Sequence, residues 1–98
     1  MSSFNELIKS TTPVLINLTA EWAPSCEDLK PILKEVKNVK GTGLNIIKID
    51  VDKNESLAKK FNVVGVPALL LFKEGKIIWR NTGLITAPEV LSKIEELI

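Results

Sequence analysis

The amino-acid sequence predicts an α/β fold in which a mixed four-stranded sheet carries helices on both faces. Two observations predict it. Strand-like and helix-like patterns alternate along the first part of the chain, and two apolar runs separated by a short polar turn follow in the second part. The chain has 98 residues, of which 45% are hydrophobic, and this is enough for one compact core. We therefore expect a single domain over residues 1–98.

The first two elements are expected to be a short helix and a buried strand. Ser3 and Glu6 are spaced as in a capping box, which predicts a helix that begins there and runs toward Ser10. Residues 14–18 are mostly apolar and partly β-branched, as is typical of a strand that is buried on both faces of a sheet. Asn17 is the one polar residue in this strand.

A loop and a longer helix follow the first strand. Residues 19–25 contain a tryptophan and a proline and are expected to form the loop. From Leu29 to Val39 apolar residues recur every three or four positions, which predicts an amphipathic helix that ends at residues 41–43. Sites in open α/β sheets usually lie at the carboxyl ends of strands, so the loop is the expected place of a site.

The remaining strands fall into a parallel pair and a hairpin. Residues 44–51 predict a second buried strand, and residues 54–61 predict a helix. Because a helix connects the first two strands, we expect them to be parallel. Residues 68–72 and 76–82 predict two further strands, and the short turn between them suits an antiparallel hairpin.

The last predicted element is a helix. Thr86 and Glu89 repeat the spacing of a capping box, and apolar residues follow them at helical intervals. This helix completes the set that we expect to cover the two faces of the sheet.

Composition argues against several classes of function. The 13 basic and 12 acidic residues leave a net charge of +1 without a basic block, so nucleic acid is not an expected partner. The chain has no histidine and one cysteine, so neither a metal site, a cofactor nor an internal disulfide is expected. No apolar run approaches the roughly 18 residues that span a bilayer, and the first residues lack the pattern of a signal segment. We therefore expect no membrane contact and a cytoplasmic location.

Four motifs make the sequence similar to thioredoxins over nearly its whole length. They are Ala20-Glu21-Trp22 ahead of a loop that ends in Cys26, Pro31-Ile32-Leu33, Gly65-Val66-Pro67 and Leu69-Leu70-Leu71-Phe72-Lys73-Glu74-Gly75-Lys76. The resemblance implies a thioredoxin-like fold and the thiol/disulfide chemistry that reduces protein disulfides.

The loop itself departs from the pattern of that family. Thioredoxins carry Trp-Cys-Gly-Pro-Cys, whereas this chain reads Trp22-Ala23-Pro24-Ser25-Cys26. By the resemblance, Ala23 occupies the position of the attacking cysteine and Cys26 that of the resolving cysteine. The buried aspartate that assists proton transfer in the family falls on Asn17, and Thr19 and Ala68 also differ from the usual residues.

The missing cysteine decides the expected chemistry. Disulfide reduction needs one thiolate that attacks a substrate sulfur and a second thiol that resolves the mixed disulfide. One sulfur cannot complete both steps, so we expect this chain to be inactive or very weak as a disulfide reductase. The alternative for Cys26 is a small buried apolar residue without chemistry, and the alternative for Asn17 is a purely structural amide.

The resemblance also implies a groove for protein substrates. Trp22, Pro24 and Ser25 would lie beside it, and Val66 would offer its backbone to an extended peptide immediately before a cis-Pro67. The alternatives are that Pro67 only shapes a turn and that Trp22 is ordinary packing.

Three functions stay open from the sequence. In the first, the chain is a thioredoxin-type protein that acts on extended protein segments with a thioredoxin-reductase-type electron donor, and Ala23 is an engineered replacement of its nucleophile. Alternatively, Ala23 is natural and the chain is a non-catalytic binding module, or it is a redox protein that acts through Cys26 alone. We expect a monomer, with a dimer linked through Cys26 as the alternative.

Overall fold

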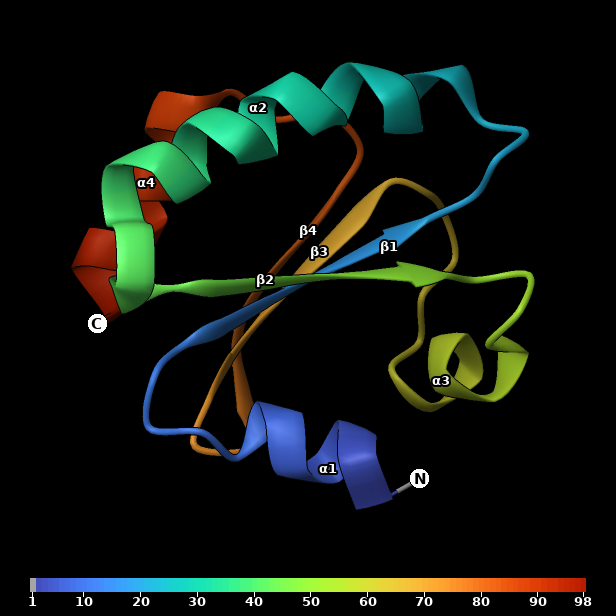
Figure 1. Ribbon diagram of the computed structural model, residues 1–98. Coiled ribbons are helices and arrows are strands. Elements are labelled where there is room, and N and C mark those ends of the chain that lie inside the picture. The colour runs from blue at the N-terminus through green and yellow to red at the C-terminus, as the bar shows by residue number, and fades with distance from the viewer. Residues whose placement is uncertain (1) are drawn as a thin grey trace.

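The computed structural model describes residues 2–98, apart from the side chains at positions 2, 3 and 5. Helices and strands alternate from the N-terminus to the third strand, after which a fourth strand and a last helix follow (Figure 1). In chain order they are α1 (Ser2–Ile8), β1 (Val14–Thr19), α2 (Pro24–Lys40), the 3₁₀ turn (Gly41–Gly43), β2 (Asn45–Asp50), α3 (Glu55–Lys60), β3 (Ala68–Lys73), β4 (Lys76–Thr82) and α4 (Ala87–Leu97).

The four strands form one mixed sheet in the order β2-β1-β3-β4. β1 pairs in parallel with β2, and it pairs antiparallel with β3 on its other side. β3 and β4 form the antiparallel hairpin. The structure therefore confirms the predicted combination of a parallel pair and a C-terminal hairpin, and it places β1 in the interior of the sheet.

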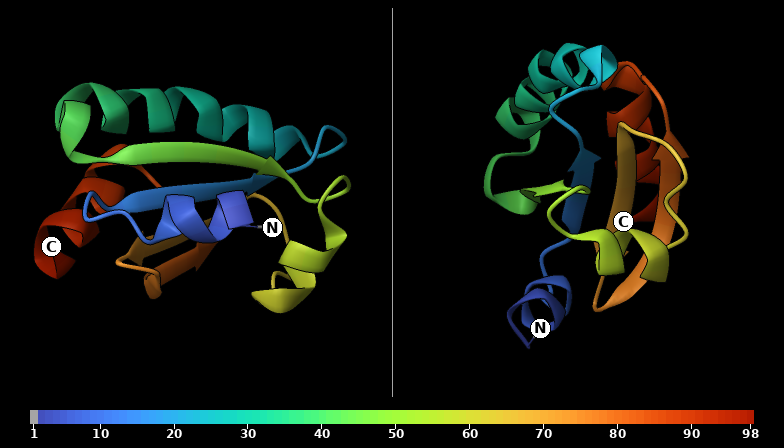
Figure 2. Two further views of the ribbon diagram at one scale, coloured as in Figure 1. Left: turned by 60° about the horizontal axis from the view of Figure 1, so that its bottom comes forward. Right: turned by 90° about the vertical axis from the view of Figure 1, so that its right-hand side faces the viewer.

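The sheet separates two apolar clusters, each covered by a pair of helices (Figures 1 and 2). Leu15 and Leu69 lie on the face that α2 and α4 cover, and both are fully buried. On the other face, which α1 and α3 cover, Phe72 packs against two aromatic rings. Its ring centroid is 6.2 Å from that of Phe4 and 5.5 Å from that of Phe61. The prediction of helices on both faces is confirmed.

The prediction for the second strand is wrong in one respect. Residues 44–51 were expected to form a buried strand, but β2 is an edge strand whose side chains are half-buried or exposed. Its apolar residues Ile46, Ile47 and Ile49 each pack against a helix-covered cluster, so they do face the core. The run of apolar residues predicts contact with the core. It does not predict whether β2 has a neighbouring strand on one side or on both sides.

Two helix starts also differ from the prediction. α1 begins at Ser2, so Ser3 lies inside the helix and is not its N-cap; the predicted capping box rests on the Ser3 side chain, which is outside the described part. α2 begins at Pro24, so Pro24 and Ser25 belong to its first turn and not to a loop. Proline is well suited to the first helical position, because an N–H group there would have no acceptor within the helix and proline has none to leave unpaired.

The hairpin turn and the last helix follow local rules that the sequence carries. Glu74 and Gly75 have φ angles of 52° and 85°, which is the backbone of a two-residue type I′ turn, and Lys73 pairs with Lys76. At the start of α4 the Thr86 side chain accepts from the Glu89 N–H, and the Glu89 carboxylate accepts from the Thr86 N–H. The second predicted capping box is confirmed. Over residues 2–98, none of the helices has the length and apolar character needed to span a bilayer.

Candidate functional site

The candidate site lies at the carboxyl ends of the parallel strands β1 and β2. β1 continues to Thr19, α2 begins at Pro24, and only residues 20–23 connect them. Strands that run in parallel end at the same edge of a sheet, so the segment after β2 reaches the same place. The cis peptide bond between Val66 and Pro67 brings a third segment there, immediately before β3.

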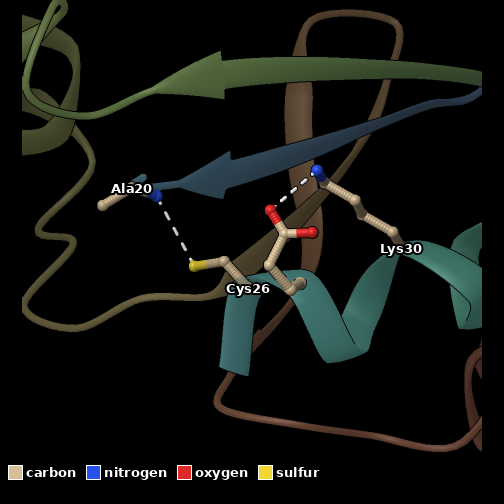
Figure 3. Close-up of polar contacts among 4 residues, drawn as sticks. Ala20, Cys26 and Lys30 are labelled. Atoms are coloured by element: carbon tan, nitrogen blue, oxygen red, sulfur yellow. Dashed lines mark hydrogen bonds and ion pairs between the residues drawn. The ribbon is translucent and has the colours of Figure 1, made fainter. Parts of the chain in front are cut away.

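Cys26 lies in the first turn of α2 and is 3% exposed. The main-chain N–H of Ala20 donates to its Sγ at 3.5 Å, as the dashed line in Figure 3 marks. Its own N–H donates to the Ala23 carbonyl at 3.1 Å. Ala20, Ala23 and Cys26 form a small buried cluster against which Val51 and Val66 pack. The sulfur is therefore covered by apolar groups and by the main chain.

Ala23 is the N-cap residue of α2, with φ −97° and ψ 112°. It is 5% exposed, and no side chain caps the helix because a methyl group has no oxygen to accept from the free N–H groups. The position that the resemblance assigns to the attacking sulfur is thus filled by a buried methyl group.

Trp22 lies on the surface and is 69% exposed. Its indole Nε1–H donates to Oδ2 of Asp52 at 2.8 Å, which ties the loop after β1 to the segment after β2. The Oδ1 atom of Asp50 in turn accepts from the main-chain N–H of Asp52 at 2.8 Å. Trp22 is accordingly an oriented surface residue and not core packing.

Asp52 is the residue whose part in this arrangement the sequence analysis missed. The sequence feature that could have indicated it is its position shortly after a parallel strand, at the edge of the sheet where the loop with Trp22 also lies. A carboxylate at that point can accept a hydrogen bond from a donor on the neighbouring loop.

The five predicted substrate-binding residues divide into two groups. Trp22 and Val66 line a common pocket of about 260 Å³, whereas Pro67 is buried and does not line it. Pro24 is exposed and Ser25 half-buried in the first turn of α2, and neither lines this pocket. The structure thus brings Trp22 and Val66 together, and Val66 also packs against the buried cluster that contains Cys26.

Asn17 lies deeper in the same half of the molecule. It is on β1 between Lys48 of β2 and Leu69 of β3, and it faces the α2 side of the sheet because it is two residues from Leu15. The side chain is 5% exposed, and its Oδ1 has no hydrogen-bond partner among the described residues. Burial of such a group costs about 1–3 kcal/mol.

An ion pair lies beside Cys26 on α2. The ammonium group of Lys30 is 2.9 Å from the carboxylate of Glu27, and the pair is marked in Figure 3. The hydrogen bond and positive charge of Lys30 hold the pKa of the Glu27 carboxyl below its usual value. Both side chains are more than half exposed, so the pair contributes little to folding.

The fold and the loop define a class of protein. A redox-type loop at the carboxyl end of an interior strand, a helix that begins with the loop, and a cis-proline beside it are the parts of a thiol/disulfide protein of thioredoxin-like fold. In this chain one cysteine is present in the loop, and the position of the other cysteine holds alanine.

Comparison with known proteins agrees with that class. The thioredoxin family model matches residues 1–96, and the chain belongs to the thioredoxin family. It is 36% identical to thioredoxin Y, chloroplastic, of Oryza sativa over 98 residues, which are 99% of this chain and 58% of that protein. It is 32% identical to a thioredoxin of Mycobacterium bovis over 95% of this chain and 80% of that protein.

A solved structure shows the same fold. The crystal structure of mitochondrial thioredoxin 3 from Saccharomyces cerevisiae superposes with a TM-score of 0.88 at 26% identity, over 98% of this chain and 89% of that one. The relatives therefore support a thiol/disulfide redox role for the family to which the chain belongs.

Proposed function

We propose that this chain is a thioredoxin-type protein that binds extended protein segments beside Trp22 and Val66 but cannot complete disulfide exchange alone. One observation carries the proposal: the single thiol of the chain, that of Cys26, is buried at the position of a resolving thiol, while Ala23 fills the attacker's position.

The chemistry of exchange explains the expected loss. In the first step a thiolate attacks one sulfur of a substrate disulfide, which forms a mixed disulfide and releases the other sulfur as a thiolate. In the second step another thiolate of the same protein attacks the mixed disulfide and releases the reduced substrate. Cys26 is placed for the second step, and the first step has no attacker because a substrate disulfide cannot reach a sulfur that is 3% exposed.

The binding surface does not depend on the missing sulfur. Within residues 2–98 the main-chain N–H and C=O of Val66 make no main-chain hydrogen bond. Val66 also lines a pocket whose apolar lining includes the exposed side chains of Trp22 and Val64. Unpaired main-chain groups of this kind accept an extended peptide as an added strand. This supports extended protein segments as the partners.

Reduction of insulin disulfides with dithiothreitol as the electron source tests the proposal. We expect the parent chain to give no rate above the reductant alone, and Ala23→Cys to give a clear gain. Ala23→Ser is the matched control without a thiol, and Ala23→Cys with Cys26→Ser keeps the attacker but removes the resolving sulfur. A gain in Ala23→Cys that disappears in both controls supports the proposal, whereas a parent chain already as active as Ala23→Cys overturns it.

A non-catalytic binding module is the second candidate, and specific residues favour it. Asn17 replaces the buried acid that the family resemblance places there, and Thr19 and Ala68 also differ from the pattern. If Ala23→Cys gains nothing while the parent chain still binds extended peptides, the binding module becomes the better description. A redox role for Cys26 alone is disfavoured by its burial, and oxidation of Cys26 by dilute hydrogen peroxide is the measurement that would restore it.

The donor, assembly and location are proposals that rest on the same family assignment. We propose a thioredoxin-reductase-type donor for the two-cysteine form Ala23→Cys, in which exchange ends with a disulfide between positions 23 and 26. The parent chain has one cysteine and forms no such disulfide. We propose a monomer, because the burial of Cys26 opposes a disulfide between two chains. We propose a cytoplasmic location, which fractionation of the native source would test.

A further inference from the structure

The outer edge of β2 is a row of main-chain groups that no strand covers within residues 2–98. β2 pairs with β1 on one side only, and the right-hand view of Figure 2 shows it at the margin of the sheet. The N–H of Val51 donates to the Thr19 carbonyl at 2.9 Å, so the odd-numbered residues of this strand direct their main chain toward β1. Because the direction alternates along a strand, Ile46, Lys48 and Asp50 direct theirs outward. Such an edge is a template for another strand.

We propose that this edge pairs antiparallel with the same edge of a second copy of the chain, about a two-fold axis at Ile49. The two sheets then continue into each other through their β2 strands. A two-fold arrangement brings the same patch of both copies together, so the patch has to be complementary to itself. The inference goes beyond the proposed function and does not depend on it, because it uses neither position 23 nor Cys26 nor Val66.

The charges of β2 provide that self-complementarity. Lys48 and Asp50 are two residues apart, so their side chains lie on the same face of the sheet. Within the described part of the chain, Lys48 forms no ion pair. The Oδ1 atom of Asp50 accepts from the N–H of Asp52, which leaves its Oδ2 atom available. Antiparallel pairing about Ile49 places Lys48 of each copy opposite Asp50 of the other, and opposite charges in such positions stabilise a sheet.

The other face of the proposed pair is apolar. Ile47, Ile49 and Val51 lie on the side that α1 and α3 cover, and all three are half-buried. In the pair, Ile49 lies opposite Ile49 of the second copy, and Ile47 lies opposite Val51. β-Branched side chains pack well against each other across strands, so the pairing removes the exposed part of these side chains from water.

The main chain and the charges together favour one register among those centred within β2. A two-fold axis between two residues would set outward-directed groups against groups that already bind β1. An axis at Lys48 or at Asp50 would place two like charges directly opposite each other. An axis at Ile47 or earlier would leave Lys48 opposite an uncharged residue. The axis at Ile49 avoids all three faults.

The pairing is expected to be weak and reversible. Residues 47–51 of each chain take part, and a contact of this length is smaller than the roughly 1,200–2,000 Å² of a stable interface. We expect a dissociation constant of about 0.1–1 mM. The chain is therefore a monomer at the micromolar concentrations of an activity assay, and it pairs when it is concentrated.

Sedimentation equilibrium of the parent chain between about 10 µM and 1 mM, with a reductant present, tests the proposal. Lys48→Asp sets two carboxylates opposite each other at both ends of the pair and is expected to weaken self-association at least about tenfold. Asp50→Lys does the same with two ammonium groups. A mixture of the two variants restores opposite charges, so we expect a mixed dimer with about the dissociation constant of the parent. Lys76→Asp on the exposed edge strand β4 is the matched control and should change nothing.

A cysteine placed on the axis tests the register without altering a charge. Ile49→Cys together with Cys26→Ser leaves one thiol at the axis, where the two Cα atoms of the pair are expected to lie about 4.5 Å apart. That distance suits a disulfide, so oxidised glutathione should cross-link this variant into a dimer. Ile47→Cys together with Cys26→Ser is the control, because four residues, or roughly 13 Å, separate its two thiol positions along the strands. It should stay uncross-linked.

Each outcome decides for or against the pairing. Lysines on edge strands often block strand addition, and a parent chain that is still monomeric at about 1 mM would show that Lys48 does so here and would overturn the proposal. Equal effects of Lys48→Asp and Lys76→Asp, or equal cross-linking at positions 47 and 49, would also overturn it. Weakening by Lys48→Asp with cross-linking only at position 49 supports it. Insulin reduction by Ala23→Cys bears on neither result.

Discussion

At the scale of single residues, the Oδ1 atom of Asn17 is buried and receives no hydrogen bond from the described residues. Replacement by leucine, which has a similar size and no polar atom, removes that cost. We therefore expect Asn17→Leu to raise the free energy of unfolding by about 1 kcal/mol in urea titration. Asn17→Asp is the control of opposite sign, because a buried carboxylate is less favourable than an amide and should lower the free energy of unfolding at neutral pH. A leucine variant less stable than the parent would contradict the expectation.

Glu27 gives a residue-level prediction for pH. Lys30 lowers the pKa of Glu27 in the folded chain, so the small stabilisation from the pair is present above the ordinary pKa of a glutamate and is lost as the pH falls through the lowered value. We expect Lys30→Met to raise the pKa of Glu27 toward its ordinary value, as measured by NMR titration of the side-chain carboxyl. Lys34→Met removes a similar charge one turn further along α2 and should have little effect. Equal shifts in both variants would show that the Lys30 contact is not the cause.

At the scale of elements, the β3–β4 hairpin depends on one glycine. Gly75 has a φ of +85°, and a Cβ atom built there would lie 3.2 Å from Cγ of Lys9. Its N–H also donates to the Ile8 carbonyl at 2.7 Å, which joins the turn to the end of α1. We expect Gly75→Ala to lower the free energy of unfolding by about 1 kcal/mol or more, because an L-residue is strained at this φ.

Gly43 provides the matched control for that change. A Cβ atom at Gly43 meets nothing within 4 Å. Gly43→Ala should therefore alter the free energy of unfolding by less than about 0.5 kcal/mol in the same urea titration. Two alanine variants of equal stability would contradict the account of the turn.

The elements also show how far the sequence could predict the structure. The capping box at Thr86 and the hairpin turn at Gly75 are local rules, and such rules can be read from a few consecutive residues. The edge position of β2 and the start of α2 at Pro24 depend on which segments come together in space. A run of apolar residues is compatible with an interior or an edge strand, and a proline is compatible with a loop or a first helical turn.

The candidate site was predictable to a similar degree. The loop that ends in Cys26, and Val66 beside it, could be placed through the family resemblance and the order of strands. The burial of Ala23 and the hydrogen bond from Trp22 to Asp52 depend on distances between β1 and β2 loops. Those distances are set by the whole sheet, so short motifs do not report them.

At the scale of the whole molecule, two apolar clusters share the strands β1 and β3. Leu69 belongs to the cluster under α2 and α4, and Leu70 to the cluster over α1 and α3; both are at most 1% exposed. Because one strand supplies both, the two faces should unfold together. We expect Leu69→Ala and Leu70→Ala each to lower the free energy of unfolding by about 2–5 kcal/mol, with a single transition by circular dichroism and by tryptophan fluorescence.

An exposed leucine provides the control for these core changes. Leu84 is 52% exposed, and its replacement by alanine should cost much less than either core substitution. Separate transitions for the two probes in either core variant would show that the two faces unfold independently.

The buried thiol of Cys26 makes local opening of this protein measurable. Since the Ala20 N–H and the surrounding methyl groups shield Cys26, an alkylating reagent can reach it only when the first turn of α2 opens. Because the chain has no other thiol, the rate at which Cys26 is labelled under native conditions measures that opening. Comparison of the labelling rate with the rate of global unfolding would show whether the first turn of α2 opens locally or only when the whole domain unfolds.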